Sequence, residues 1–295
     1  MTIQEMVLLA LAEGWAVPAF NIPYLPMVEP VARAIADEKA PGIIHVARVE
    51  WIKFQSESLE AVAKEYRKYE KPGLTYLGLD HIPVIDEDQK TVDYLPIIKR
   101  AVDAGYESVM IDGSRLDLEN NIAATKKVAA MVHRSGIACE GEIGAVMGHE
   151  SGPMKPYEEI FTAKLGFTKI DEAVRFAGES GCDWMSVAVG NIHGAVAEAT
   201  RHQKKPEARL DVAHIAALSK ASGIPLVLHG GSGIPENYIR QGIAAGIAKI
   251  NVATEIRQAY ERELTASGAV DKAREAVYRR TREILAAMTG GRGGR

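Results

Sequence analysis

Three of the eight histidines follow short apolar segments that are typical of buried strands. His81 ends the sequence LDH, His193 lies in NIHG, and His229 begins HGGSG. Neutral imidazoles suit Zn²⁺, and three protein ligands with an open fourth position are typical of a catalytic zinc site. A single histidine at such a place is more often a hydrogen-bonded residue of the core, but three at corresponding strand ends favour a metal. The pattern therefore predicts a catalytic metal site.

The last two apolar segments lead into residues that could bind an anion. Glycines in a loop let backbone N–H groups turn toward a phosphate group, and the N-terminus of a following helix adds a favourable dipole. A tight turn between a strand and a helix is the alternative interpretation of the glycines. The residues predicted to bind phosphate are Gly230, Gly231, Ser232, Asn251, Val252, Ala253 and Thr254.

Carboxylates beside the histidines could transfer protons or hold a metal. Asp80 precedes His81 and could act as a proton donor or acceptor near the metal. Asp112 ends another apolar segment, and Glu140 and Glu142 lie two residues apart, on the same face of a strand. Asp112 and Glu142 could bind a second metal ion, or they could form a buried network that orients a histidine.

The elements that must position these side chains alternate along the whole chain. Eight apolar or β-branched segments are separated by amphipathic stretches without hairpin signals, which indicates parallel strands with crossover helices. The predicted strands are residues 15–22, 42–47, 74–80, 108–112, 137–143, 184–189, 225–229 and 248–253. The predicted helices are residues 25–39, 59–69, 94–104, 116–133, 169–181, 211–221 and 236–245, with one or two more over 254–288.

Eight strand–helix units in 295 residues match an α/β fold, the (β/α)8 or TIM barrel, which typically has about 250 residues. A doubly wound sheet is the alternative, but it rarely uses eight sequential units of even spacing. We expect a single barrel domain over residues 1–289 and a flexible Gly/Arg tail at 290–295. In a barrel, the carboxyl ends of the strands form the active site, and the loops after strands seven and eight commonly bind phosphate. The predicted metal and phosphate residues should therefore surround one mouth.

Composition excludes several classes of protein. Hydrophobic residues make up 47% of the chain and charged residues 25%, which is ordinary for a globular protein. The net charge of −4 gives no basic footprint for nucleic acid, and no apolar segment is long enough to span a bilayer. The first residues lack the basic start of a signal peptide, and two cysteines argue against a disulfide framework. We expect a cytoplasmic protein that binds neither nucleic acid nor membrane.

Several sequence blocks resemble the class II, metal-dependent aldolases that act on fructose or tagatose bisphosphate. The resemblance covers nearly the whole chain and implies a TIM barrel. The blocks are VPAFN at 17–21, LDH at 79–81, SVMIDGS at 108–114, EGEIG at 140–144, HG at 193–194, HGGSG at 229–233 and NVAT at 251–254.

The resemblance also implies a reaction. The family reversibly cleaves a ketose 1-phosphate or ketose bisphosphate to dihydroxyacetone phosphate and an aldehyde, through a metal-stabilised enediolate. The zinc ligands correspond to His81, His193 and His229, and cobalt or iron could replace zinc. Asp80 corresponds to the proton donor. Glu150 corresponds to the lid residue that takes a proton from dihydroxyacetone phosphate.

Further contacts follow from the same resemblance. Asp112 and Glu142 match a second metal position that some members have. The partner is a small phosphorylated sugar, and a homodimer or homotetramer is expected. The positions implied to bind substrate are Asn21, Gly194, Gly230, Gly231, Ser232, Asn251, Val252, Ala253 and Thr254.

Three segments near the predicted mouth depart from the family pattern. Ile82 and Pro83 follow His81 where a glycine is usual, and the lid reads MGHES at 147–151 instead of Gly-Gly-x-Glu-Asp. Residues 47–51 read ARVEW where a serine and small residues are usual. The metal ligands and the phosphate segments keep the pattern, so the aldehyde end should differ. An aldehyde other than glyceraldehyde 3-phosphate is expected.

Other functions fit these residues less well. A metal-dependent hydrolase on a barrel would use the same three histidines to activate water, but the phosphate segments and the lack of a His-x-His pair count against it. A non-catalytic barrel subunit that supports a partner would need none of the predicted site residues. A class I aldolase needs a Schiff-base lysine, and Lys249 is the only lysine in the predicted strands.

Overall fold

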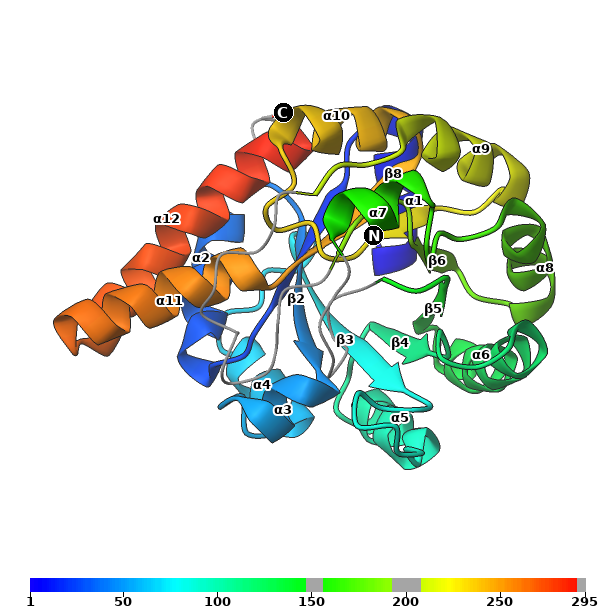
Figure 1. The fold of residues 1–295 in the computed structure, drawn as a ribbon. Coiled ribbons are helices and arrows are strands. Elements are labelled where there is room, and N and C mark those ends of the chain that lie inside the picture. Colours follow the sequence, from blue (N-terminus) through cyan, green and yellow to red (C-terminus); the bar gives the residue numbers. More distant parts are fainter. Residues whose placement is uncertain (147–155, 193–207, 291–295) are drawn as a thin grey trace.

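Eight parallel strands close into a barrel in the order β1 to β8, with β8 beside β1 (Figure 1). The structure, a computed structural model, describes residues 1–146, 156–192 and 208–290. Helices cover the outside of the barrel, so the predicted (β/α)8 fold is confirmed. The strands are β1 Val17–Asn21, β2 Gly42–Ala47, β3 Thr75–Pro83, β4 Ser108–Asp112, β5 Ala138–Ile143, β6 Trp184–Val187, β7 Leu226–Leu228 and β8 Ile247–Val252.

The outer helices turn an apolar face toward the strands. In α2, for example, Val28, Val31, Ala32 and Ile35 are buried, which is the spacing of one helix face. The α-helices are α1 Ile3–Glu13, α2 Val28–Glu38, α3 Arg48–Lys53, α4 Leu59–Tyr66, α5 Tyr94–Asp103, α6 Leu118–Val132, α7 Tyr157–Thr162, α8 Ile170–Ser180, α9 Val212–Ser222, α10 Glu236–Ala244, α11 Thr254–Ser267 and α12 Val270–Thr289. Two 3₁₀ turns, η1 Leu25–Met27 and η2 His133–Ser135, complete the described helical segments.

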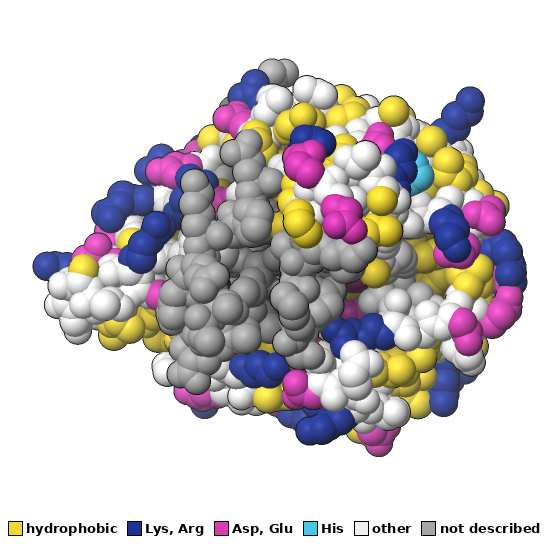
Figure 2. All heavy atoms as spheres, in the orientation of Figure 1, with side chains coloured by type: hydrophobic (Ala, Val, Ile, Leu, Met, Phe, Trp, Pro, Cys, Tyr) yellow, Lys and Arg dark blue, Asp and Glu magenta, His cyan; other side chains and the backbone are white. Residues whose placement is uncertain are grey.

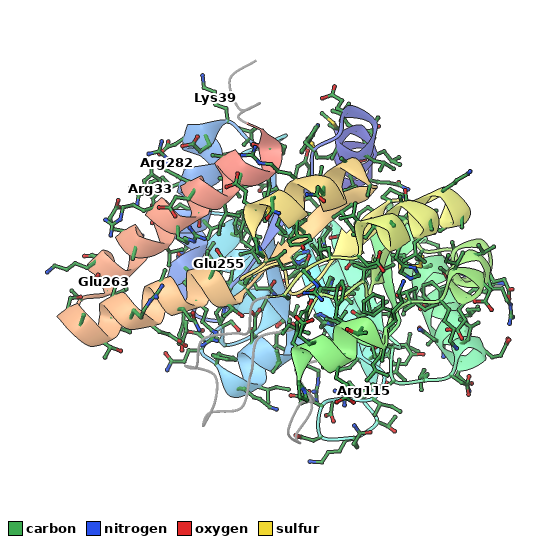
Figure 3. All side chains as sticks on the ribbon, turned by 45° about the horizontal axis from the view of Figure 1, so that its top comes forward. Arg33, Lys39, Arg115, Glu255, Glu263 and Arg282 are labelled. Atoms are coloured by element: carbon green, nitrogen blue, oxygen red, sulfur yellow. The ribbon has the colours of Figure 1, made fainter. Side chains whose placement is uncertain are left out.

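The last helical stretch, residues 254–288, consists of two helices. Gly268 ends α11 with a left-handed φ of 65°, a conformation that glycine adopts at low cost, and α12 starts two residues later. Gly290 ends α12 in the same way, and residues 291–295 of the expected tail lie outside the described residues. Ion pairs link α12 to α2, with Arg33 facing Glu275 at 2.9 Å and Arg282 facing Glu38 (Figure 3).

Helix α1 was not predicted, and it covers the amino ends of the strands. Thr2 and Glu5 form a capping box at its start. Its buried residues Met6, Val7 and Ala10 belong to an apolar cluster that includes one or more residues from each strand except β4. The helix therefore closes the end of the barrel that is opposite the expected active site.

Strand β3 is irregular where the predicted site begins. Its register with β4 shifts between Leu79 and Ile82, and His81 has a φ of 24°. A strand normally alternates its side chains between two faces, and such a bulge re-aims a side chain. The strand continues to Pro83, three residues beyond the predicted end.

The surface carries charged side chains of both signs, interspersed over the face in Figure 2. Within the described residues, no helix is long and apolar enough to cross a membrane. Both cysteines, Cys139 and Cys182, are buried as free thiols.

Candidate active site

Asp80 lies inside the barrel, where two amides hold its carboxylate. Asn21 Nδ2 donates to Oδ2 at 2.8 Å, and Asn251 Nδ2 donates to Oδ1 at 2.9 Å. Burial alone would raise the pKa of Asp80, but the nearby His81 and His45 outweigh it and hold the pKa well below its usual range. Asp80 is thus a fixed, ionised carboxylate with both oxygens occupied.

His81 lies against three other predicted site residues. Its Nδ1 is 3.1 Å from Asp112 Oδ2 and 3.7 Å from Glu142 Oε2, and its Nε2 is 2.7 Å from His229 Nδ1. Burial would lower the pKa of His81, but Asp80, Asp112 and Glu142 outweigh it and raise the pKa to about 10. The structure therefore brings together two of the three predicted metal ligands and both predicted second-metal residues.

Glu142 has the property expected of a metal ligand. Its Oε2 is buried and has no hydrogen-bond partner among the described residues, although it lies 3.8 Å from His229 Nδ1. A buried acceptor without a donor is costly, and a cation at this point would remove that cost. Burial, and then repulsion by Asp112, raises the pKa of Glu142 well above its usual range. Imidazole nitrogens and carboxylate oxygens together suit a divalent transition metal, so these residues fit the implied group.

Glu140 orients His229. Its Oε1 lies 2.8 Å from His229 Nε2, while its Oε2 accepts from Lys249 Nζ at 2.8 Å and from Trp184 Nε1 at 2.6 Å. A carboxylate on Nε2 fixes the tautomer of a histidine and turns its Nδ1, here toward His81, to the side where a metal would bind. Burial would raise the pKa of Glu140, but Lys249 and His229 outweigh it and lower the pKa to about 2.

A continuous chain of hydrogen bonds joins Asp80 to His229. Lys249 Nζ donates to Asn251 Oδ1 at 2.6 Å, and Asn251 in turn donates to Asp80. The roles of Lys249 and Glu140 were missed in the sequence. Their spacing was visible, because each lies two residues from a predicted site residue on its own strand.

Two more buried groups near Asp80 were also missed. His45 Nδ1 lies 3.9 Å from Asp80 Oδ1, and burial lowers the pKa of His45 to about 3, so the ring is neutral. Glu50 accepts from the Ala47 N–H at 2.8 Å and from Asn21 Nδ2 at 3.5 Å. Burial raises the pKa of Glu50 to about 8.

The segments predicted to bind phosphate follow β7 and β8. Ser232 Oγ accepts from the Glu255 N–H at 3.4 Å, at the start of α11. A Cβ on Gly231 would lie only 2.7 Å from Ile250 Cγ2, so the loop backbone packs closely on β8. Backbone N–H groups at a helix start of this kind can bind an anion.

Some residues predicted to bind substrate have side chains that a ligand could not reach. Val252 is buried in the core, so only its backbone could reach a ligand, while Ala253 and Thr254 are half-buried. Gly230 has a left-handed φ of 59°. Asn251 uses its amide inside the barrel, as described above.

His193, Gly194 and Glu150 lie outside the described residues. Before His193 in the chain, Asn191 Nδ2 donates to the His229 carbonyl at 3.0 Å.

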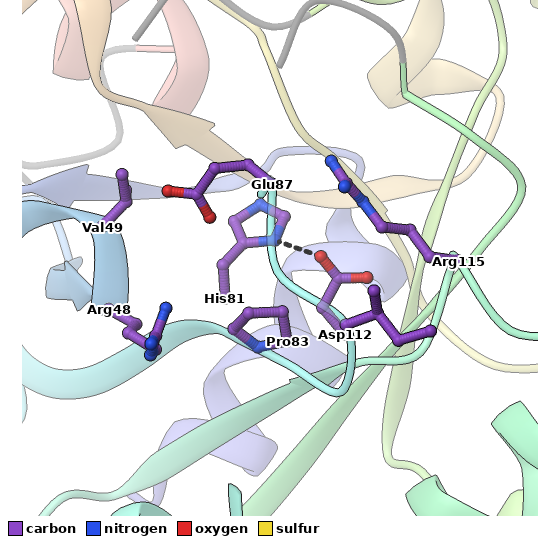
Figure 4. A pocket seen from close by; sticks show the side chains of 8 residues that line it. Arg48, Val49, His81, Pro83, Glu87, Asp112 and Arg115 are labelled. Carbon is purple, nitrogen blue, oxygen red and sulfur yellow. Dashed lines mark hydrogen bonds and ion pairs between the residues drawn. The ribbon is translucent and has the colours of Figure 1, made fainter. Parts of the chain in front are cut away.

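A hollow lies over His81 on the side of β2 to β4 (Figure 4). Arg48 follows β2, and Arg115 lies in the loop after β4. The residues that line the hollow are Arg48, Val49, His81, Pro83, Ile85, Glu87, Asp112 and Arg115.

The sequence of this barrel is similar to those of known proteins. The family described as "Fructose-bisphosphate aldolase class-II" matches residues 1–290. The chain belongs to this family.

Two relatives of this class II aldolase are both named 6-phospho-5-dehydro-2-deoxy-D-gluconate aldolase. The one from Halalkalibacterium halodurans is 34% identical over 262 residues, which cover 88% of this chain and 82% of the relative. The one from Shouchella clausii is 32% identical over 246 residues, covering 82% and 75%.

Solved structures agree with this assignment. The YdjI aldolase from Escherichia coli K12 superposes with a TM-score of 0.78 at 26% identity, with complete coverage of both chains. A putative fructose-1,6-bisphosphate aldolase from Coccidioides immitis gives a TM-score of 0.77 at 25% identity, covering 98% of this chain and 96% of that one. This class II aldolase is therefore an aldehyde-lyase of carbohydrate metabolism, from a metal-dependent family that acts on phosphorylated sugars.

Proposed function

We propose that this class II aldolase reversibly cleaves a phosphorylated ketose or keto acid to dihydroxyacetone phosphate and an aldehyde. The observation that carries the proposal is the placement of Asp80, an ionised carboxylate held by Asn21 and Asn251, beside His81 and His229. A general acid–base group next to a metal site is what aldol cleavage needs. A non-catalytic subunit that supports a partner would need neither an acid–base group nor a metal site.

His81, His193 and His229 would hold the metal, which we propose is zinc, with cobalt or iron as substitutes. Asp112 and Glu142 would either complete a second metal position or fix the His81 ring. When bound, a divalent metal supplies positive charge that stabilises an enediolate. Glu140 and Lys249 keep the His229 ring in its tautomer, as the distances of 2.8 Å on both sides of Glu140 favour.

In the cleavage direction, Asp80 removes the proton from the hydroxyl whose carbon becomes the aldehyde. In the condensation direction, Asp80 returns that proton to the alkoxide. Its two amide partners leave no freedom of rotation, so the carboxylate is oriented before substrate arrives. Glu150 would exchange the second proton, on the hydroxyl-bearing carbon of dihydroxyacetone phosphate.

The phosphate group would sit on Gly230–Ser232 and on the residues from Asn251 to Thr254, with Gly194 and Asn21 as further contacts. The start of α11 supports this proposal, since its N–H groups and dipole favour an anion. We propose further that the enzyme is cytoplasmic and forms a homodimer or homotetramer.

The named substrate of the two curated relatives suggests the aldehyde. A 6-phospho-5-dehydro-2-deoxygluconate has a ketone next to its phosphate-bearing carbon and a carboxylate at the other end. Aldol cleavage between its third and fourth carbons releases dihydroxyacetone phosphate and 3-oxopropanoate. A keto acid of this class is our first candidate substrate, ahead of fructose 1,6-bisphosphate.

Deuterium exchange tests the reaction without knowledge of the aldehyde. The enzyme in heavy water should exchange one proton of dihydroxyacetone phosphate, measured by proton NMR, and exchange should stop after chelation and return with zinc, cobalt or iron. Unphosphorylated dihydroxyacetone serves as the control substrate. Full exchange by enzyme that elemental analysis shows to be metal-free would contradict the proposal. Phosphate ester hydrolysis without exchange would instead favour the hydrolase.

A further inference from the structure

The hollow over His81 contains two arginines that the aldol chemistry does not use. Arg48 stands at the start of α3 and Arg115 in the loop after β4, and His81 of β3 lies between them (Figure 4). Each arginine is tied to the same turn. Arg115 Nη1 donates to the Asp86 carbonyl at 2.7 Å, and Arg48 Nη1 lies 3.4 Å from Asp86 Oδ2.

The charges around the hollow are unevenly compensated. Glu87 is paired with Lys53 at 2.6 Å, outside the lining, and Asp112 faces His81. Arg115 makes no ion pair with a carboxylate among the described residues, because its partner on Asp86 is a neutral carbonyl. Among the described residues, the hollow therefore presents a guanidinium group that no carboxylate pairs with, and a hydrogen bond to the Asp86 carbonyl holds it in position.

The barrel topology places this hollow at the far end of a bound substrate. In the strand order, β3 lies opposite β7, and the segments proposed to bind phosphate follow β7 and β8. A substrate whose phosphate sits on Gly230–Ser232 and whose carbonyl lies beside His81 extends toward β2, β3 and β4. The group released as the aldehyde then faces Arg48 and Arg115.

We propose that Arg115, assisted by Arg48, binds an anionic group on the aldehyde end of the substrate. This inference rests on the proposed function and adds its specificity. A planar guanidinium group suits both carboxylate and phosphate oxygens, and its charge-assisted hydrogen bonds are stronger than neutral ones. Arg115 is exposed, so it can meet an incoming anion, and Arg48, on the other side of His81, is half-buried.

The test compares three aldehydes with dihydroxyacetone phosphate as the common donor. They are 3-oxopropanoate, which carries a carboxylate, glyceraldehyde 3-phosphate, which carries a phosphate, and uncharged propanal. Wild-type enzyme should have a higher kcat/KM for at least one anionic aldehyde than for propanal. Arg115→Gln and Arg48→Gln should lower that kcat/KM by roughly 10- to 100-fold, mainly through KM, and change the propanal value less than twofold.

Arg134→Gln is the matched control, because Arg134 is an exposed arginine in η2, at the opposite end of the barrel. Arg115→Lys keeps the positive charge but lacks the planar guanidinium group. It should recover part of the kcat/KM that Arg115→Gln loses. A larger loss with 3-oxopropanoate would identify a carboxylate, and a larger loss with glyceraldehyde 3-phosphate a phosphate.

Two results would overturn the inference. One is equal use of charged and uncharged aldehydes by the wild type, and the other is an equal loss for all three aldehydes in Arg115→Gln. Deuterium exchange into dihydroxyacetone phosphate is measured on the same samples. Intact exchange with either of these results means that the anion site alone is wrong, whereas absent exchange in the wild type means that the proposed function is wrong.

Discussion

Lys249 and Glu140 form an ion pair inside the barrel, with Lys249 Nζ 2.8 Å from Glu140 Oε2. Both side chains are buried, and the pair joins the hydrogen bonds of His229 to those of Asp80 through Asn251. An ion-paired ammonium group is a poor nucleophile. The only lysine of the predicted strands is thus a structural support of the site, consistent with metal-dependent rather than Schiff-base chemistry.

Removal of this lysine should destabilise the protein, because Glu140 would remain as a buried, unpaired charge. Lys249→Met leaves the charge of Glu140 without its cation and should reduce stability by about 3–5 kcal/mol. The double variant Lys249→Met with Glu140→Gln should recover much of that loss, because no unpaired charge remains. Thermal and urea unfolding measure both. Lys220→Met, at an exposed position of α9, is the control; a single variant as stable as this control would disprove the coupling.

Each of the three histidines should be necessary for metal binding. His81→Ala, His193→Ala and His229→Ala should bind less than about one tenth of the metal that the wild type retains, since an open site depends on all three ligands. Elemental analysis after gel filtration measures the stoichiometry. His133→Ala, in η2 at the other end of the barrel, should retain the metal. Unchanged metal content in any of the three ligand variants would remove that residue from the site.

The two proton transfers should separate by mutation. Asp80→Asn should keep much of the deuterium exchange into dihydroxyacetone phosphate but lose condensation and cleavage by roughly 10²-fold or more. Glu150→Gln should lose exchange while metal and phosphate binding persist. Proton NMR measures the deuterium exchange, and coupled assays of the product measure condensation and cleavage. Exchange by Glu150→Gln at the wild-type rate would assign that transfer to another base.

A side chain at Gly231 should distort the loop after β7. Gly231→Ala places a Cβ 2.7 Å from Ile250 Cγ2, so the loop must shift, and overpacking of this kind costs about 1–3 kcal/mol. Calorimetry should show a weaker affinity for dihydroxyacetone phosphate and little change for dihydroxyacetone. Gly178→Ala, in helix α8 with open space around it, should change neither affinity. Equal affinity of wild type for the two ligands would mean that these segments do not bind phosphate.

Stability should depend on pH through Glu50. Burial raises the pKa of Glu50 to about 8 from an ordinary value of 4.5, so the folded state holds a proton that the unfolded state releases. The contribution of Glu50 to stability is then greatest below pH 4.5 and falls as pH rises toward 8, by roughly 1.4 kcal/mol per pH unit. Glu50→Gln keeps both hydrogen-bond donors satisfied and removes this slope.

Melting temperatures measured at pH 5.5 and 7.5 test whether the stability falls as pH rises. The advantage of Glu50→Gln over wild type should grow with pH, whereas Glu57→Gln, at an exposed position, should follow the wild type. A wild type that gains stability relative to Glu50→Gln as pH rises would show that Glu50 is ionised in the folded state.

The sequence predicted the strands and the meeting of His81 and His229 because these depend on local features. Buried parallel strands are continuous apolar segments, and a closed barrel brings their carboxyl ends to one mouth. The contact between Lys249 and Glu140 could not be predicted, since 109 positions separate the two residues. Spacing within one strand says which face a residue shares, but not which residue it meets across the barrel.

Helices α1, α3 and α7 were not predicted from the sequence, and each omission has a physical reason. Helices α3 and α7 have only 6 residues each, too few for a periodic pattern. Helix α1 leaves Leu8 and Leu9 exposed while burying Met6 and Val7, which blurs its amphipathic pattern. The bulge at His81 depends on the register of β3 with β4, and no single strand contains that information.

Helix α1 sets an order for folding on the ribosome. It is synthesised before the strands, yet the surface it covers is assembled from every strand except β4, and β8 ends only at Val252. Its apolar face therefore lacks part of its partner surface until β8 has emerged, and at translation rates of roughly 5–20 residues per second this takes many seconds. During that interval Met6, Val7 and Ala10 cannot be fully buried, so we expect docking of α1 to be one of the last steps of folding.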